Sequence, residues 1–348
     1  MANAFWVTGP GQGKIGEAGL NLPESAVPAN NAIDSTVVVR TLYSGISRGT
    51  ESLVFSNQVP ASEFQSMRSP FQEGDFPFPV KYGYANVGRV IEGPPALKGR
   101  CVFSLFPHQQ EFRLPASAVN PLPDELPAER AVLAANMETA VNGLWDAAPT
   151  VGDRIAVVGL GVVGCLVAWL ANQIPGTRVT AIDVNPARQS VAEALGLNFA
   201  LADEMTADDH DLVVHASGHP AGLEKALSLC GPEATVIEMS WYGEQSVPAP
   251  LGRAFHSRRL TIRSSARPGL SHRRHPLLGQ LLGVLRRVFE RLHVVAENVH
   301  RHRETALLDC RTVFDAIGEE LGGVLLHLDR LLQRVREEPL GSLSVRRS

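Results

Sequence analysis

Three closely spaced glycines form the part of the sequence best suited to bind an anion. Gly159, Gly161 and Gly164 spell G-L-G-V-V-G directly after the apolar run "IAVV" and directly before a second apolar run. At this spacing the first glycine permits a tight turn, the second lets a diphosphate approach the backbone, and the third lets a helix pack on a strand. The N-terminus of that helix, at Val162 and Val163, would offer N–H groups and partial positive charge.

An acidic residue follows at the distance expected for a carboxylate that binds the ribose of a dinucleotide. Asp183 closes the predicted strand "RVTAIDV", nineteen positions after Gly164. A carboxylate there accepts hydrogen bonds from ribose hydroxyls, so the pattern predicts a dinucleotide-binding fold rather than a merely structural glycine turn. The same carboxylate would repel a 2′-phosphate, which favours NAD. Arg188, one helical turn further on, keeps NADP open, unless it is a solvated helix residue.

The composition and the cysteine spacing argue against a membrane protein, a nucleic-acid-binding protein and a secreted protein. The stretch "IAVVGLGVVGCLVAWLA" has seventeen residues without a charge, slightly fewer than the roughly twenty that a membrane span needs. A chain of 348 residues with 44% apolar and 20% charged residues and a net charge of −4 is typical of a soluble protein that binds neither membrane nor nucleic acid. Its four cysteines form no CxxC pair, and its start has no secretory pattern, so we expect a cytoplasmic protein.

The chain divides into segments with different predicted secondary structure. Short β-rich runs fill residues 35–115, a helical segment follows, and strands alternate with helices from Arg154 onward. We therefore predict an α/β protein with a β-rich domain over 1–125 and a Rossmann domain, a doubly wound parallel sheet, over 126–265. Residues 266–348 read as an atypical helical return to the first domain.

That last segment differs in charge from the rest. From residue 267 onward there are 14 arginines, no lysine and 10 acidic residues, whereas residues 1–266 carry 18 bases against 26 acids. Its leucines recur at helical spacing. The segment is either a genuine helical extension that forms an oligomer or partner surface, or the product of a shifted reading frame.

Several motifs together resemble one known superfamily. The runs "YSGISRGTES", "KYGYANVGRV", "METAVNGL", "VVGLGVVG" and "HASG" occur in this order over residues 30–265. They resemble the medium-chain dehydrogenase/reductases, the zinc-type alcohol dehydrogenase family, and within it a branch that includes bacteriochlorophyllide dehydrogenase. The resemblance implies that the β-rich domain is a GroES-like catalytic domain.

The resemblance also implies a zinc site, whose ligands this sequence lacks. Where the family has cysteine and histidine ligands, the chain has Ser47, Tyr84 and, by alignment of the crossover helix, Ala135. Zinc needs three Cys, His or carboxylate ligands and an open position. We therefore predict a catalytic site without a metal.

Three residues are then candidates for the acid–base chemistry. Tyr84 replaces the family's histidine and could donate a proton, Lys81 could lower the pKa of that phenol or bind substrate, and Ser47 could extend a proton relay. Each also has an ordinary reading, as a space filler, a surface cation or a turn residue. His108, after a predicted strand, could contact substrate, although a turn histidine is the more common case.

The resemblance adds coenzyme contacts to those of the glycine motif. Arg48 matches a basic residue that meets the pyrophosphate, Thr139 matches the crossover threonine beside the nicotinamide, and Ser217 ends a Rossmann strand near the ring.

The predicted function is hydride transfer between NAD, or NADP, and a small-molecule alcohol or carbonyl, without zinc. The alternatives are oxidation of a hydroxyethyl group on a tetrapyrrole, and a non-catalytic regulatory protein that binds a dinucleotide. Homodimers formed by pairing of edge strands are common in the family, so the resemblance leaves a homodimer open here, while the sequence does not settle the oligomeric state.

Overall fold

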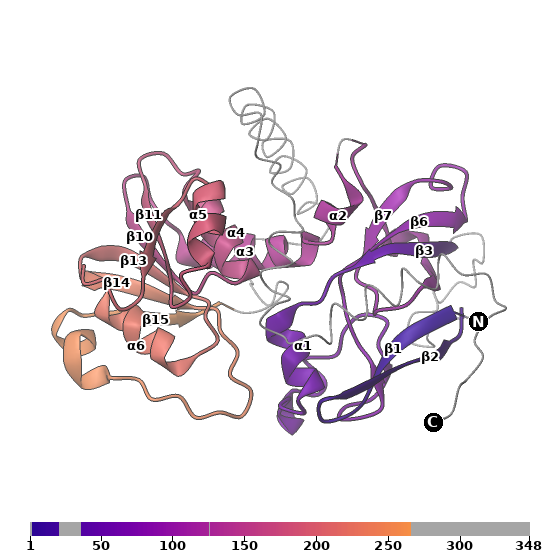
Figure 1. Ribbon diagram of the computed structural model, residues 1–348, viewed down its shortest axis with the longest axis horizontal. Helices are drawn as coiled ribbons and strands as arrows, with labels where there is room; N and C mark the ends of the chain where they lie inside the picture. The colour runs from indigo at the N-terminus through magenta and orange to yellow at the C-terminus, as the bar shows by residue number, and fades with distance from the viewer. Residues whose placement is uncertain (1, 21–35, 125, 266–348) are drawn as a thin grey trace, which may run out of the picture. The chain divides into compact units, whose positions relative to one another are not determined.

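The computed structural model describes residues 2–20, 36–124 and 126–265, and the predicted helical tail lies outside this range. The described chain forms two antiparallel-paired sheets in its first half and one parallel sheet in its second half (Figure 1). The predicted α/β fold class, a Rossmann-type sheet beside a β-rich part, is therefore confirmed.

The first half contains a five-stranded and a four-stranded sheet. The five-stranded sheet has the order β8-β3-β6-β7-β9, with β3 at Thr36–Ser44, β6 at Asn86–Glu92, β7 at Cys101–Ser104, β8 at Glu111–Pro115 and β9 at Asn120–Pro121. The other has the order β2-β1-β5-β4, with β1 at Ala2–Gly9, β2 at Gln12–Ala18, β4 at Glu73–Gly74 and β5 at Val80–Lys81. The hairpin β1–β2 was not among the predicted elements.

Alternating apolar side chains hold the five-stranded sheet together. Val37, Val39, Val90, Phe112 and Leu114 are buried in one cluster, as expected where every second residue of a strand faces the same side. The helix α1, at Arg48–Phe55, follows β3 after a three-residue turn. This short connection places the run "SGISRGTES" at the end of a well-packed strand.

The second half is a six-stranded parallel sheet. Its order is β12-β11-β10-β13-β14-β15, with β10 at Arg154–Val158, β11 at Arg178–Asp183, β12 at Asn198–Leu201, β13 at His210–His215, β14 at Cys230–Glu238 and β15 at Thr261–Ser264. The strand order reverses between β10 and β13, because β11 and β12 extend to one side of β10 and β13 to β15 to the other. Such a reversal marks the crevice where open α/β sheets bind ligands.

Helices pack on this sheet as its apolar strands require. These helices are α3 at Ala134–Ala147, α4 at Val162–Ala171, α5 at Arg188–Ala194 and α6 at Pro220–Ser228. The short helix α2, at Ala128–Ala131, instead contacts β3 and β6 of the five-stranded sheet. The helix α4 contacts β10, β11 and α3, and α6 contacts β13 and β14 (Figure 1). Within the described ranges, no helix is both long and apolar enough to pass through a membrane.

Candidate functional site

The glycine motif forms the turn between β10 and α4. The N–H of Gly159 donates to the carbonyl of Ile182 at 2.8 Å, and its φ of +97° is one that side-chain-bearing residues rarely adopt. A Cβ at Gly159 would lie 2.5 Å from the Cα of Ser217, and one at Gly164 would lie 1.8 Å from the Gly159 carbonyl oxygen. Both positions therefore require glycine, and the turn stands open at Gly161, which is exposed.

Asp183 holds this turn from the end of the neighbouring strand. Its Oδ2 accepts a hydrogen bond from the Leu160 N–H at 2.6 Å, and its Oδ1 accepts one from the Asn185 N–H at 2.9 Å. The carboxylate is only partly buried, and each of its oxygens has a further acceptor position. The geometry brings the predicted ribose ligand to the rim of the glycine turn.

The other predicted coenzyme residues differ in their surroundings. Arg188 is 5% exposed, and its positive charge lies close enough to act on the buried thiol of Cys165, so the alternative of a solvated helix residue is wrong. Thr139 lies on α3, where its hydroxyl donates to the Ala135 carbonyl at 3.1 Å. Arg48 and Ser217 are exposed. Their roles in binding a coenzyme stay predictions.

A second cluster of polar side chains lies in the β-rich half. Ser44 ends β3, and its Oγ lies 2.5 Å from Nδ1 of His108. The Nε2 of His108 lies 2.7 Å from Oε2 of Glu51 on α1, and the other oxygen of Glu51 accepts the Ser47 N–H at 2.7 Å. The residues form a Ser–His–carboxylate chain of the kind that moves protons in many enzymes.

Charge and burial set the protonation of this chain. Burial disfavours the imidazolium of His108, but the nearby charge and hydrogen bond of Glu51 outweigh it, so the pKa of His108 is raised. The side chains of His108 and Glu51 are only 12% and 11% exposed. His108 therefore binds a proton more readily than a free imidazole does. Neither its sequence position nor that of Glu51 made this pairing evident.

The residues predicted for catalysis are only partly brought together. Ser47 shares Glu51 with His108, and a Cβ at Gly83 would lie 2.9 Å from the His108 ring, so Tyr84 follows directly on a segment that touches the cluster. The half-buried ring of Tyr84 meets Tyr82 edge-on at 6.1 Å between centroids. The contacts place Ser47 in the cluster and Tyr84 at its border.

Lys81 lies in a different environment. Its side chain is 0% exposed, and its Nζ contacts the carboxylate of Glu73 and the amide oxygen of Gln109. Burial lowers the pKa of Lys81, and the hydrogen bond and charge of Glu73 oppose the shift. The surface-cation reading is therefore wrong, and these partners favour a role in holding β4 on β5.

Replacing Lys81 tests this role. Lys81→Ala should lower the free energy of unfolding by about 2 kcal/mol, because it removes the buried partner of a half-buried ion pair and leaves a cavity. Urea unfolding measures the loss, and Lys98→Ala, at an exposed lysine, is the matched control. A variant as stable as the wild type but without turnover would restore the catalytic reading of Lys81.

The positions of the family's zinc ligands do not fit a zinc ion. Ser47, Tyr84 and Ala135 offer two hydroxyl groups and a methyl group, and Ala135 is buried in the apolar cluster that includes Val132 and Met137. In the part of the chain that the structure covers, no group of three or more His, Cys, Asp or Glu side chains is placed to hold a metal. Chemistry without zinc stays a prediction.

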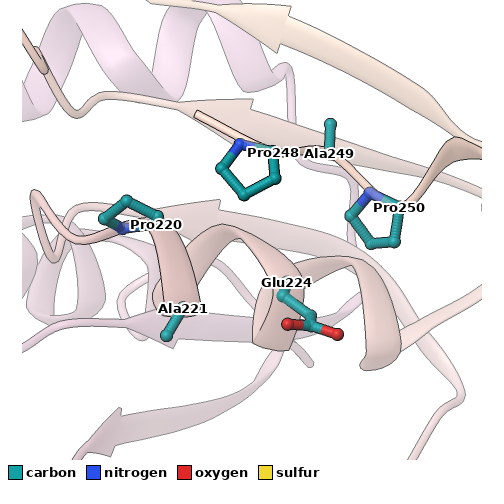
Figure 2. Close-up of a pocket in the computed structure, with 6 residues that line it drawn as sticks. All are labelled: Pro220, Ala221, Glu224, Pro248, Ala249 and Pro250. Carbon is teal, nitrogen blue, oxygen red and sulfur yellow. The ribbon is translucent and has the colours of Figure 1, made fainter. Parts of the chain in front are cut away.

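A pocket also lies at the N-terminus of α6. Figure 2 shows it between Pro220, Ala221 and Glu224 of the helix and the segment Pro248, Ala249 and Pro250. Glu224 is the titratable residue among them, and it pairs with the exposed Arg253 at 2.9 Å. The lining offers mainly apolar contacts, and Glu224 is its one residue with a side chain suited to acid–base chemistry.

In comparisons with known proteins, the chain is similar to several dehydrogenases over part of its length. It matches no protein-family model. It is 28% identical over 130 residues to L-threonine 3-dehydrogenase of Ruegeria pomeroyi, across 37% of each chain. It is 26% identical over 151 residues to an uncharacterised zinc-type alcohol dehydrogenase-like protein of Escherichia coli, across 40% of this chain and 43% of that one. The alignments thus span well under half of these relatives.

A solved structure extends the likeness to the fold. Acetophenone reductase from Geotrichum candidum, in complex with NAD, superposes with a TM-score of 0.59 at 16% identity, over 76% of this chain and 82% of that one. The resemblance to the medium-chain dehydrogenase/reductase superfamily is confirmed. At the positions where the family resemblance implies zinc ligands, this chain has Ser47, Tyr84 and Ala135.

Proposed function

We propose that the chain is an NAD(P)-dependent oxidoreductase that interconverts an alcohol and a carbonyl compound without zinc. The observation that carries the proposal is the glycine turn of Gly159, Gly161 and Gly164, closed by Asp183 at the point where the strand order reverses. The dehydrogenases to which the chain is similar support the reaction type. No feature within the described residues favours the tetrapyrrole or the regulatory alternative.

The residues of the turn fit a dinucleotide. Val162 and Val163 are the first residues of α4, so their N–H groups belong to a helix N-terminus, which suits a diphosphate. Asp183 suits ribose hydroxyls. When bound, the nicotinamide would accept or supply the hydride. Because the carboxylate of Asp183 is negative, we propose NAD as the preferred coenzyme.

Proton transfer falls to the chain's own residues. We assign it to the cluster of Ser44, His108 and Glu51, in which the substrate hydroxyl proton passes to Ser44 Oγ as the proton of Ser44 passes to His108 Nδ1. Glu51 stabilises the imidazolium that forms, consistent with the raised pKa of His108. In the reverse direction the same proton returns to the developing alkoxide.

Removal of metal tests the absence of zinc. After dialysis against a strong chelator, reduction of a carbonyl panel by NADH should proceed at an unchanged rate, and elemental analysis should find less than one equivalent of zinc before treatment. Loss of turnover on chelation, with recovery on adding zinc, would reject the zinc-free mechanism but keep the oxidoreductase.

Coenzyme choice should change when the charge of Asp183 is removed. Asp183→Asn keeps an oxygen for the Leu160 N–H and abolishes repulsion of a 2′-phosphate, so the affinity for NADPH relative to NADH should rise about tenfold. Calorimetric titration measures both dissociation constants, and Asp75→Asn, at a surface carboxylate, is the control. An unchanged ratio would remove Asp183 from ribose recognition.

A further inference from the structure

A second chain of hydrogen bonds ends at Ser217, in the half of the molecule with the parallel sheet. The Oγ of Ser217, just beyond β13, lies 2.6 Å from Nε2 of His215. The Nδ1 of His215 lies 2.8 Å from Oε2 of Glu238 at the end of β14. The same carboxylate accepts the Ser240 N–H at 2.7 Å and the Tyr242 hydroxyl at 3.1 Å. His215 is 0% exposed, whereas Ser217 is exposed.

The charge state of Glu238 determines which groups donate the hydrogen bonds around it. Burial opposes ionisation of Glu238, but His215 and Ser240 outweigh it and lower its pKa. Burial and the charge of Glu238 raise the pKa of Tyr242, so the tyrosine donates to the carboxylate. An ionised carboxylate only accepts hydrogen bonds, so His215 donates from Nδ1.

The polarity of Ser217 follows from that of His215. In a neutral imidazole that donates from Nδ1, Nε2 is an acceptor, so the Ser217 hydroxyl donates inward to it. Its oxygen keeps two acceptor positions, and the His219 N–H occupies one of them at 3.2 Å. The second acceptor position of the Ser217 oxygen is available to a ligand, because Ser217 is exposed. Ser217 is therefore fixed as a hydrogen-bond acceptor toward anything that binds beside it.

The position of Ser217 indicates what binds there. A Cβ at Gly159 would meet its Cα at 2.5 Å, so Ser217 borders the glycine turn. Asp183, on the β11 side of β10, suits the ribose next to the adenine. β13 pairs with the opposite side of β10, so the nicotinamide half of a dinucleotide that crosses the turn extends toward Ser217.

Ester hydrolysis by a Ser–His–Glu triad fits this site poorly. Such chemistry needs N–H groups aimed at an oxyanion. The two N–H groups that follow Ser217 already have partners, because Gly218 donates to Ser240 Oγ at 3.0 Å and His219 donates to Ser217 itself.

We propose that Ser217, oriented by His215 and Glu238, accepts a hydrogen bond from the carboxamide NH₂ of the nicotinamide and so selects the amide over the corresponding acid. The inference rests on the proposed function, since it requires a nicotinamide dinucleotide on the glycine turn. A carboxylate in place of the carboxamide would set one acceptor against another and leave Ser217 without a donor.

Two dinucleotides that differ in this one group test the proposal. Calorimetry at one fixed pH gives the dissociation constants of NAD and of nicotinic acid adenine dinucleotide. The wild type should bind NAD at least about tenfold more tightly. Ser217→Ala should bring the ratio close to one, and Ser228→Ala, at an exposed serine of α6, should leave it unchanged.

A second variant tests the direction of the bonds. In Glu238→Gln the amide oxygen should stay on the Ser240 N–H and the amide NH₂ should face His215, which would then donate to Ser217 from Nε2. Both acceptor positions of Ser217 would then be filled, by His215 and by the His219 N–H. Its own proton has the His219 carbonyl as an acceptor at 3.4 Å, so the preference for the amide should be lost. Equal affinities in the wild type, or an unchanged ratio in Ser217→Ala, would overturn the inference. Failure of both dinucleotides to bind would overturn the proposed function as well.

Discussion

Gly161→Val should weaken binding of NADH by at least about 100-fold while the protein stays folded. Gly161 is the N-cap of α4, with φ −69°, and a Cβ there has no atom within 4 Å. The protein therefore has room for a side chain, and valine at the N-cap costs at most about 1 kcal/mol. The valine would stand where the diphosphate must approach the backbone. Calorimetry measures the affinity, and a thermal melt measures the fold.

The control for this change is a valine at a glycine outside the site. Gly252 has an equally open Cβ position and lies in the segment Leu251–Phe255. Gly252→Val should bind NADH as the wild type does. If Gly161→Val also binds normally, no diphosphate rests on this turn.

His108→Gln should lower turnover by about 10²- to 10³-fold, with little change in the affinity for NADH. The glutamine can still donate to Glu51, but it cannot take a proton from Ser44. Steady-state rates with a carbonyl or alcohol that the wild type accepts measure the effect. His256→Gln, at an exposed histidine, is the matched control. Turnover at the wild-type level would remove the cluster from the chemistry.

The same variant should show a pH-dependent loss of stability. The pKa of His108 is raised above its ordinary 6.5 in the folded protein, so folding favours the protonated form. The stability that this histidine contributes is fully present below its unfolded pKa and is lost as the pH rises through the raised folded value. Urea unfolding at several pH values should therefore find the largest cost of His108→Gln in mild acid. A cost that grows with pH would contradict the pairing with Glu51.

The parallel-sheet half could be predicted because its signals are local. The apolar strand, the glycine spacing and Asp183 are close in the sequence. Gly159 and Gly164 are required by contacts with Ser217 and with the Gly159 carbonyl, whereas Gly161 is left open. The hairpin β1–β2 was missed because the tip "TGPGQGK" hides its alternation. In the structure, Phe5 and Trp6 pair there with Ile15 and Lys14.

The cluster of Ser44, Glu51 and His108 could not be predicted, because His108 is distant in the sequence from the other two residues. Ser44 and His108 are 64 positions apart, and only the packing of β3, α1 and the segment after β7 brings them together. The burial of two charged residues could not be predicted either. Lysine and arginine usually lie on the surface, but Lys81 and Arg188 are buried. The hydrogen bond that the Leu160 N–H donates to Asp183 likewise follows from strand register and not from the motif.

Titration of the full chain with NADH tests the central claim most directly, since the proposed chemistry depends on a dinucleotide at the glycine turn. The structure predicts saturable binding of one NADH per chain, tighter than that of NADPH. No heat of binding with either coenzyme at millimolar concentration would contradict the account.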